Sequence, residues 1–158
     1  MREDYLDHLR RHPGGWSRST PGAHLTASSL IWSPTDRRVL LTLHARLGRW
    51  LQTGGHIDPG DPDLESAALR EATEESGLSG LVLDPTPLLL SRHEVPCGPV
   101  RPAFHLDVQY LVTVDRVRPP RVSSESTAVQ WFPDGELPAV DDSVRQLVAA
   151  AGRRLGWP

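Results

Sequence analysis

A glycine-rich loop that leads into a helix with three clustered glutamates constrains this chain more than any other feature. The loop reads GGHIDPGD at residues 54–61, and the helix ends in LREATEESGL at residues 69–78. On a wheel of about 100° per residue, Glu71, Glu74 and Glu75 fall within an arc of about 100°. Like charges at this spacing cost about 0.2–0.5 kcal/mol per pair, and negative charge in the last turn opposes the helix dipole. The sequence therefore predicts a cation bound against this face.

Mg²⁺ and Mn²⁺ are the cations that this arrangement favours. Both prefer hard oxygen ligands and keep positions for water and substrate phosphates. The small Ala68 and Ala72 beside the acidic arc let the helix approach a sheet closely, and Arg70 can pair with one glutamate. The glycine loop can bring backbone carbonyls near the carboxylates. The alternative is an ordinary solvated face, which does not explain why the glutamates gather at the helix end.

Capping signals bound this helix at both ends. Asp61 is a good N-cap and Pro62 a good first helical residue, so a helix is predicted over residues 62–76. Gly77 suits the left-handed position that follows a helix end. Strands are predicted on both sides of the helix, at residues 24–32, 38–45, 49–53, 87–95, 104–114 and 127–132.

Two more helices are predicted near the ends of the chain. Residues 3–12 form a short helix in an N-terminal extension, residues 1–15, which Pro13-Gly14-Gly15 closes. A final helix from Asp141 to about Leu155 carries an apolar side made of Val144, Leu147, Val148 and Ala151. Strands around one central helix, with another helix at the end, favour the α/β fold class.

The composition excludes several function classes. At 158 residues the chain fits one domain, residues 1–158, with a core that needs no disulfides. The net charge of −3 predicts no binding to a nucleic acid polymer or an anionic membrane. All 17 basic residues are arginines, which excludes a Walker A loop because that loop needs a lysine. The single Cys97 and the lack of an apolar run of about 20 residues predict a cytoplasmic protein.

The loop and the helix together resemble the Nudix box, whose pattern is G-x5-E-x7-R-E-U-x-E-E-x-G-U, with U a bulky aliphatic residue. Residues 54–78 carry the resemblance, and Arg70 through Leu78 match its second half except that Ala72 is small. In the first half Asp61 replaces the glutamate, and one extra residue precedes Arg70. We expect the metal site to be intact and Asp61 to act as the helix cap.

The Nudix resemblance implies an α/β/α sandwich with a mixed central sheet. It also implies metal-dependent hydrolysis of a nucleoside diphosphate linked to another group. Carried over to this chain, Glu71, Glu74 and Glu75 are the metal-binding carboxylates, and the carbonyl of Gly54 is a further ligand. Arg70 orients the cluster by ion pairing, and it joins Glu74 and Glu75 among the catalytic residues.

The general base stays open between two sources. A metal-bound Glu71 or Glu75 is one. The other is a glutamate downstream of the box, for which Glu125 is the candidate because it precedes a Trp-Phe pair as in the family. Glu94, at a predicted strand end, is the weaker alternative, and an exposed loop role is the alternative for Glu125.

Substrate contacts are less specified. Arg49, or Arg46, lies just before the glycine loop and is a candidate for binding phosphate, with a plain surface arginine as the alternative. His56 lies inside the loop and is a second candidate, with a loop-shaping role as its alternative.

The implied substrate is a nucleoside triphosphate, a nucleotide sugar or a dinucleotide, and the implied cofactor is Mg²⁺, with Mn²⁺ as a substitute. A non-catalytic nucleotide sensor or regulator on the same fold is the alternative, supported by Asp61 and the extra residue. Homodimers are frequent in the family, although no feature of this sequence fixes an interface.

Two rival sites find little support. His93, Cys97 and His105 do not have the spacing of paired zinc ligands, and a fourth ligand is not evident. An isomerase on the Nudix fold would need a catalytic cysteine, and Cys97 sits in a Pro-Cys-Gly-Pro turn that looks structural.

Overall fold

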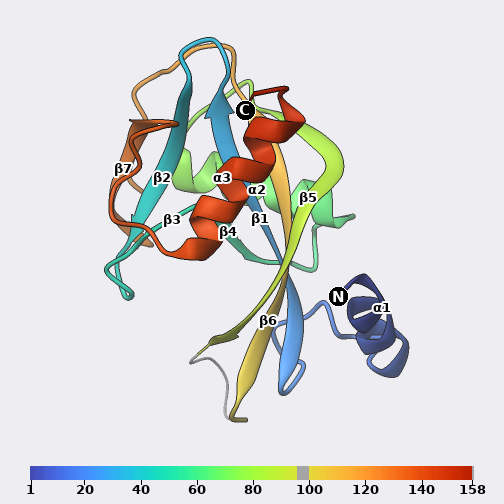
Figure 1. Ribbon diagram of the computed structural model, residues 1–158. Helices are drawn as coiled ribbons and strands as arrows, with labels where there is room; N and C mark the ends of the chain where they lie inside the picture. The colour runs from blue at the N-terminus through green and yellow to red at the C-terminus, as the bar shows by residue number, and fades with distance from the viewer. Residues whose placement is uncertain (96–99, 158) are drawn as a thin grey trace.

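A seven-stranded mixed sheet forms the centre of the computed structural model, which describes residues 1–95 and 100–157 (Figure 1). The strand order is β3-β2-β1-β6-β5, and β4 pairs with β1 while β7 pairs with β2. The strands are β1 Ala23–Ser33, β2 Arg38–His44, β3 Trp50–Leu51, β4 Thr53–His56, β5 Val82–Val95, β6 Ala103–Thr113 and β7 Ser126–Pro133.

Strand β1 organises the sheet because its two edges are used differently. One edge pairs in parallel with β6 along almost its whole length, from Ala23 to Trp32. The other edge is divided, since Thr26–Ser29 pair antiparallel with β4 and Ile31–Ser33 pair antiparallel with β2. This division places the start of the glycine loop, which is β4, directly beside the middle of the central strand.

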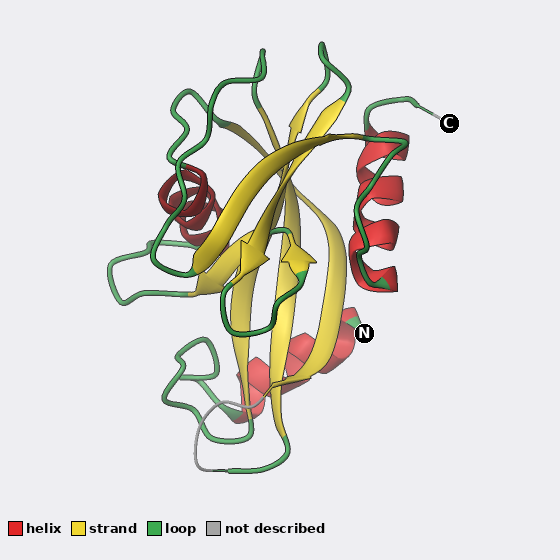
Figure 2. Cartoon of the chain, turned by 90° about the vertical axis from the view of Figure 1, so that its left-hand side faces the viewer, coloured by secondary structure: helices red, strands yellow, loops and turns green. Residues whose placement is uncertain are grey.

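Two helices cover the two faces of the sheet (Figure 2). Helix α2, Leu64–Ser76, buries Ala67, Ala68 and Ala72 completely, so its backbone packs close to the strands. Helix α3, Asp142–Arg154, buries the predicted apolar side, and Val144 and Leu147 pack in one cluster with Trp32. The predicted α/β/α sandwich with a mixed sheet is therefore confirmed.

The third helix, α1, Arg2–Arg11, lies beside the lower half of the sheet in Figure 1. Tyr5 anchors it, since its hydroxyl donates to the carbonyls of Ser91 at 2.8 Å and Asp107 at 3.2 Å. None of the helices in the described part of the chain is long and apolar enough to cross a bilayer.

The start of α2 differs from the prediction. Asp63, not Asp61, is the N-cap, and its side chain accepts a hydrogen bond from the Ser66 amide at 2.8 Å. Pro62 lies before the helix. The C-terminal prediction is confirmed, because Gly77 adopts a left-handed conformation with φ of 65°. The extra residue is thus accommodated in the loop, and the spacing of the helical glutamates is unaffected.

Two strand boundaries also differ. The glycine loop begins as strand β4, because its backbone pairs with β1 although it offers no apolar alternation. Strand β5 begins at Val82 rather than at residue 87, with an irregularity in its pairing to β6 between Asp84 and Leu89.

Replacing Asp63 by alanine tests the corrected helix start. The substitution removes the cap of α2 and should lower the free energy of unfolding by about 1 kcal/mol. Chemical denaturation measures the loss. Glu65→Ala, in the first turn of the same helix, is the control and should cost less. An unchanged midpoint for Asp63→Ala would contradict the assigned cap.

Candidate active site

Two consecutive glycines bring strand β4 and helix α2 into contact. Gly54 has φ of 152°, and a Cβ there would lie 2.6 Å from Ser28 Cα. A Cβ on Gly55 would lie 2.6 Å from Oε1 of Glu71. A side chain at the first glycine is excluded by the backbone of β1, and one at the second would displace the Glu71 carboxylate.

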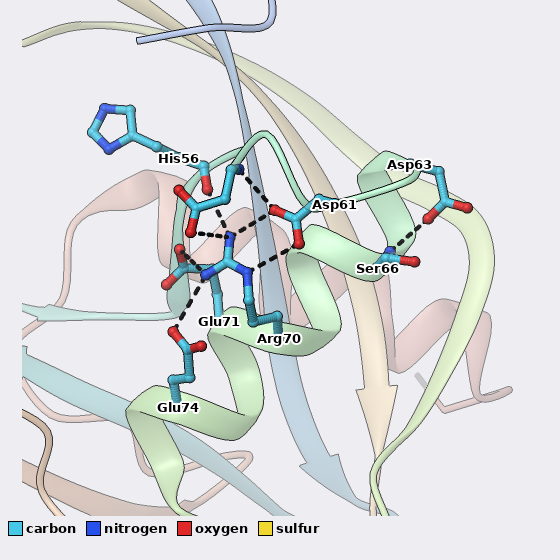
Figure 3. A network of polar contacts seen from close by, with 8 residues as sticks. His56, Asp61, Asp63, Ser66, Arg70, Glu71 and Glu74 are labelled. Atoms are coloured by element: carbon cyan, nitrogen blue, oxygen red, sulfur yellow. Dashed lines mark hydrogen bonds and ion pairs between the residues drawn. The ribbon is translucent and has the colours of Figure 1, made fainter.

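Arg70 gathers the acidic side chains around one guanidinium (Figure 3). Its Nε and Nη2 donate to the two oxygens of Asp61 at 3.0 and 2.8 Å. Its Nη1 donates to Glu71 at 3.0 Å and to Glu74 at 3.3 Å, and Nη2 also donates to the His56 carbonyl at 3.0 Å. Arg70 therefore ties the loop to the helix and fixes the Glu71 carboxylate.

Asp61 is the bidentate partner of this arginine, a role that the sequence did not reveal. Its hydrogen bonds from Arg70 hold the pKa of the Asp61 carboxyl below its usual value, although burial opposes this. The same bonds raise the pKa of Arg70. The Asp61 side chain is 8% exposed, so the pair is held mostly out of water.

Glu75 is a buried acid, and no ion pair involving it occurs among residues 1–95 and 100–157. It is 7% exposed, and burial raises its pKa to about 8, with the nearby charges of Glu71 and Glu125 adding to the effect. Burial also raises the pKa of Glu71, while its hydrogen bond from Arg70 acts in the opposite direction. A divalent cation suits the chemistry of these donors, since they are hard carboxylate oxygens whose charges raise one another's pKa values.

Glu125 comes to this cluster from a distant part of the sequence. It immediately precedes β7, and its carbonyl accepts a hydrogen bond from the Ala45 amide at 2.9 Å. Its charge acts on both Glu71 and Glu75, as their raised pKa values record. Glu74 lies at the rim, with its side chain 59% exposed. The structure thus groups four of the five glutamates that the sequence singled out, whereas the fifth, Glu94, is exposed on β5 opposite Phe104.

The two predicted substrate contacts lie elsewhere. Arg49 is exposed in the turn between β2 and β3, where its carbonyl accepts a hydrogen bond from the His44 amide. The His56 imidazole points away from the Arg70 network (Figure 3). Its ring lies beside those of His24 and His105, with centroid distances of 5.1 and 5.2 Å.

Similar architecture occurs in several solved structures of other proteins. A Nudix-family hydrolase from Clostridium perfringens aligns with TM-score 0.68 and 22% identity, over 83% of this chain and 97% of that one. A C. elegans Ap4A hydrolase aligns with TM-score 0.67 and 17% identity, over 84% and 97%. The NUDIX domain of Shewanella oneidensis NrtR, in complex with ADP ribose, aligns with TM-score 0.66 and 20% identity, over 98% and 99%. At these identities the likeness establishes the fold class.

The family follows from the sequence match. Residues 10–151 match the NUDIX domain. The chain therefore belongs to the Nudix family and is a Nudix-type hydrolase, which confirms the resemblance noted in residues 54–78.

Replacing Glu75 by glutamine tests how much the ionisation of this buried carboxyl destabilises the metal-free protein. Because the folded pKa lies above the ordinary value of 4.5, the folded protein keeps a proton that the unfolded chain loses. Stability should therefore fall as the pH rises from about 4.5 to about 8. Glu75→Gln cannot ionise, so above this window it should unfold with a free energy higher by about 2–4 kcal/mol.

Denaturant unfolding in excess chelator, at about pH 5 and about pH 9, measures this effect. Glu74→Gln is the control, because that side chain is mostly exposed, and it should change little. If the free energy of unfolding depends on pH in the same way in native protein and in Glu75→Gln, Glu75 is not the group whose ionisation destabilises the fold.

Replacing Gly55 by alanine tests the contact between β4 and α2. The new methyl group should displace the Glu71 carboxylate and weaken divalent-cation binding by about tenfold or more, with little loss of fold. Gly60→Ala is the control, since nothing lies within 4 Å of a Cβ there. Calorimetric titration with Mn²⁺ compares the two variants. Equal affinities would show that Glu71 does not depend on this glycine.

Proposed function

We propose that the chain hydrolyses the diphosphate bond of a nucleoside diphosphate linked to another group, with Mg²⁺ or Mn²⁺ as cofactor. The observation that carries the proposal is that the charges of Glu71 and Glu125 act on the buried Glu75, with Glu71 lying against Gly55, in a member of the Nudix family. Membership supports nucleotide-derived pyrophosphate hydrolysis, and the carboxylate cluster supports the metal requirement.

The metal ligands of this proposal are Glu71, Glu74, Glu75 and the carbonyl of Gly54. A bound divalent cation would neutralise the diphosphate and favour attack at phosphorus. Arg70 holds Glu71 and Glu74 in place through its hydrogen bonds at 3.0 and 3.3 Å. Its bidentate pairing with Asp61 keeps the guanidinium from turning towards the substrate.

Glu125 is the proposed general base. It is exposed at the edge of the cluster, where an attacking water can reach it, whereas Glu75 is buried. A general base must lie within reach of the water whose proton it accepts. Glu125 therefore accepts the proton, and Glu75 contributes as a ligand.

The proposed substrates are a nucleoside triphosphate, a nucleotide sugar and a dinucleotide. The Ap4A hydrolase and the ADP-ribose complex among the similar structures support nucleotide-derived ligands of this kind. Arg49 is the proposed phosphate contact because it is a positively charged, exposed side chain. The backbone carbonyl of His56 holds Arg70, and its imidazole is the second proposed contact.

The proposal extends to the state of the protein. We take residues 1–158 to work as a single domain in the cytoplasm, with the lone cysteine in support of a reducing setting. A homodimer is expected by family analogy, and light scattering of the purified protein tests it.

A substrate panel with product identification tests the function. Native protein with Mg²⁺ should release nucleoside monophosphate, phosphate or pyrophosphate from at least one substrate. Glu71→Gln and Glu75→Gln should each lower kcat/KM by at least about 100-fold, because each removes a charge from the cation site. Glu65→Gln, on the same helix, is the matched control and should keep nearly full activity.

Two outcomes would overturn this assignment. Activity unchanged by both substitutions would refute the role of the carboxylates. Calorimetric nucleotide binding without turnover of any substrate would favour the sensor function, for which the replacement by Asp61 is the supporting observation.

A further inference from the structure

Three histidines from three strands gather at a second place on the sheet. His24 of β1, His56 of β4 and His105 of β6 each offer one ring nitrogen, and these nitrogens lie within 4.8 Å of one another. The register explains the grouping, since His24 pairs directly with His105 across the parallel strands and His56 pairs with the nearby Thr26. The three rings are thus positioned by paired backbone rather than by a loop.

His24 lacks a partner that its burial demands. It is 5% exposed, and its Nε2 is buried without a hydrogen-bond partner. A buried polar atom without a partner destabilises the fold unless something satisfies it. The rings of His56 and His105 lie within about 5 Å of it, at centroid distances of 5.1 and 4.8 Å.

Burial favours the uncharged form of the three imidazole rings. Burial lowers the pKa of His24 and of His56, and it lowers the pKa of His105 to about 3. The uncharged imidazole, which burial favours, is the form that binds metals.

The donor set and its dimensions fit a transition metal. Three imidazoles around tetrahedral Zn²⁺ at about 2.0–2.1 Å place their nitrogens about 3.4 Å apart. The observed nitrogens lie within 4.8 Å of one another, so small side-chain rotations that shift them by about 1 Å would bring them to this distance. His56 and His105 are half-buried, so two of the three rings are partly exposed to solvent.

Charged side chains of both signs act on the rings. Arg18 acts on His24 and His56, while Asp58 acts on His56 with the opposite sign. Charges of both signs therefore act on the rings, and the imidazole nitrogens are the ligands that a cation would bind.

We propose that His24, His56 and His105 bind one transition-metal ion of the Zn²⁺ type, at a site separate from the carboxylate cluster. The ion would join β1, β4 and β6 at one point. Because the His56 carbonyl accepts from Arg70, the ion would also fix the backbone that positions this arginine. The site differs from the zinc alternative considered from sequence, in which His105 was grouped with His93 and with Cys97, which lies outside the described residues.

Cobalt titration isolates this site from the acidic one. The Glu71→Gln, Glu75→Gln double variant removes two carboxylates of the other cluster and serves as the background. Co²⁺ should bind it with one ion per chain and give the intense visible absorption of tetrahedral coordination, and Zn²⁺ should displace it. Excess Mg²⁺ should leave the spectrum unchanged, because magnesium prefers oxygen ligands.

Substitution then assigns the ligands. His56→Gln and His105→Gln in this background should each lower Co²⁺ affinity at least tenfold and lose the tetrahedral spectrum. His44→Gln, on β2, is the control and should retain both. Circular dichroism checks that each variant is folded, and both positions are half-buried, so neither substitution falls in the fully buried core.

The proposal fails on either of two results. One is absence of a tetrahedral Co²⁺ spectrum in the folded background protein. The other is a spectrum and stoichiometry that folded His56→Gln and His105→Gln leave unchanged.

Discussion

The Arg70 guanidinium is the interaction on which the rest of the site depends. It holds both oxygens of Asp61, one oxygen each of Glu71 and Glu74, and the His56 carbonyl. One positive charge thus faces several negative ones, and it is placed to orient them without neutralising them. Burial raises the pKa of Glu75 to about 8 and the charges of Glu71 and Glu125 add to the rise, so this carboxyl keeps its proton at neutral pH while no cation is bound. A divalent cation would supply the positive charge that Arg70 alone does not provide for these carboxylates.

The sheet makes this arrangement possible through the divided edge of β1. Because β4 pairs with only part of that edge, its backbone lies close to α2 while β2 takes the remainder. The close approach needs helix residues without bulk, which Ala68 and Ala72 provide, and strand residues without side chains, which Gly54 and Gly55 provide. The small residues therefore allow α2 to pack closely against β4, and this close packing places the carboxylate of Glu71 beside the strand backbone.

The sequence predicted those parts of the structure that local patterns encode. The apolar side of α3 and the end of α2 at Gly77 follow from periodicity and from a left-handed requirement, and both are confirmed. The predicted start of α2 is wrong because Asp61 and Asp63 are both suitable N-cap residues. In the structure Asp61 pairs with Arg70, and Asp63 caps the helix. Strand β4 was missed because a run of glycines carries no side-chain alternation to detect. Tertiary pairing settles both cases.

The histidines show a different limit of sequence reasoning. His24, His56 and His105 are far apart along the chain, and only the parallel pairing of β1 with β6 and the antiparallel pairing with β4 bring them together. Strand β4 then separates two kinds of chemistry. At Gly55 the strand contacts oxygen donors on α2, whereas His56 directs a nitrogen donor towards β1 and β6. Hard and softer cations discriminate between such donors, so two sites one residue apart on the same strand need not compete for the same ion.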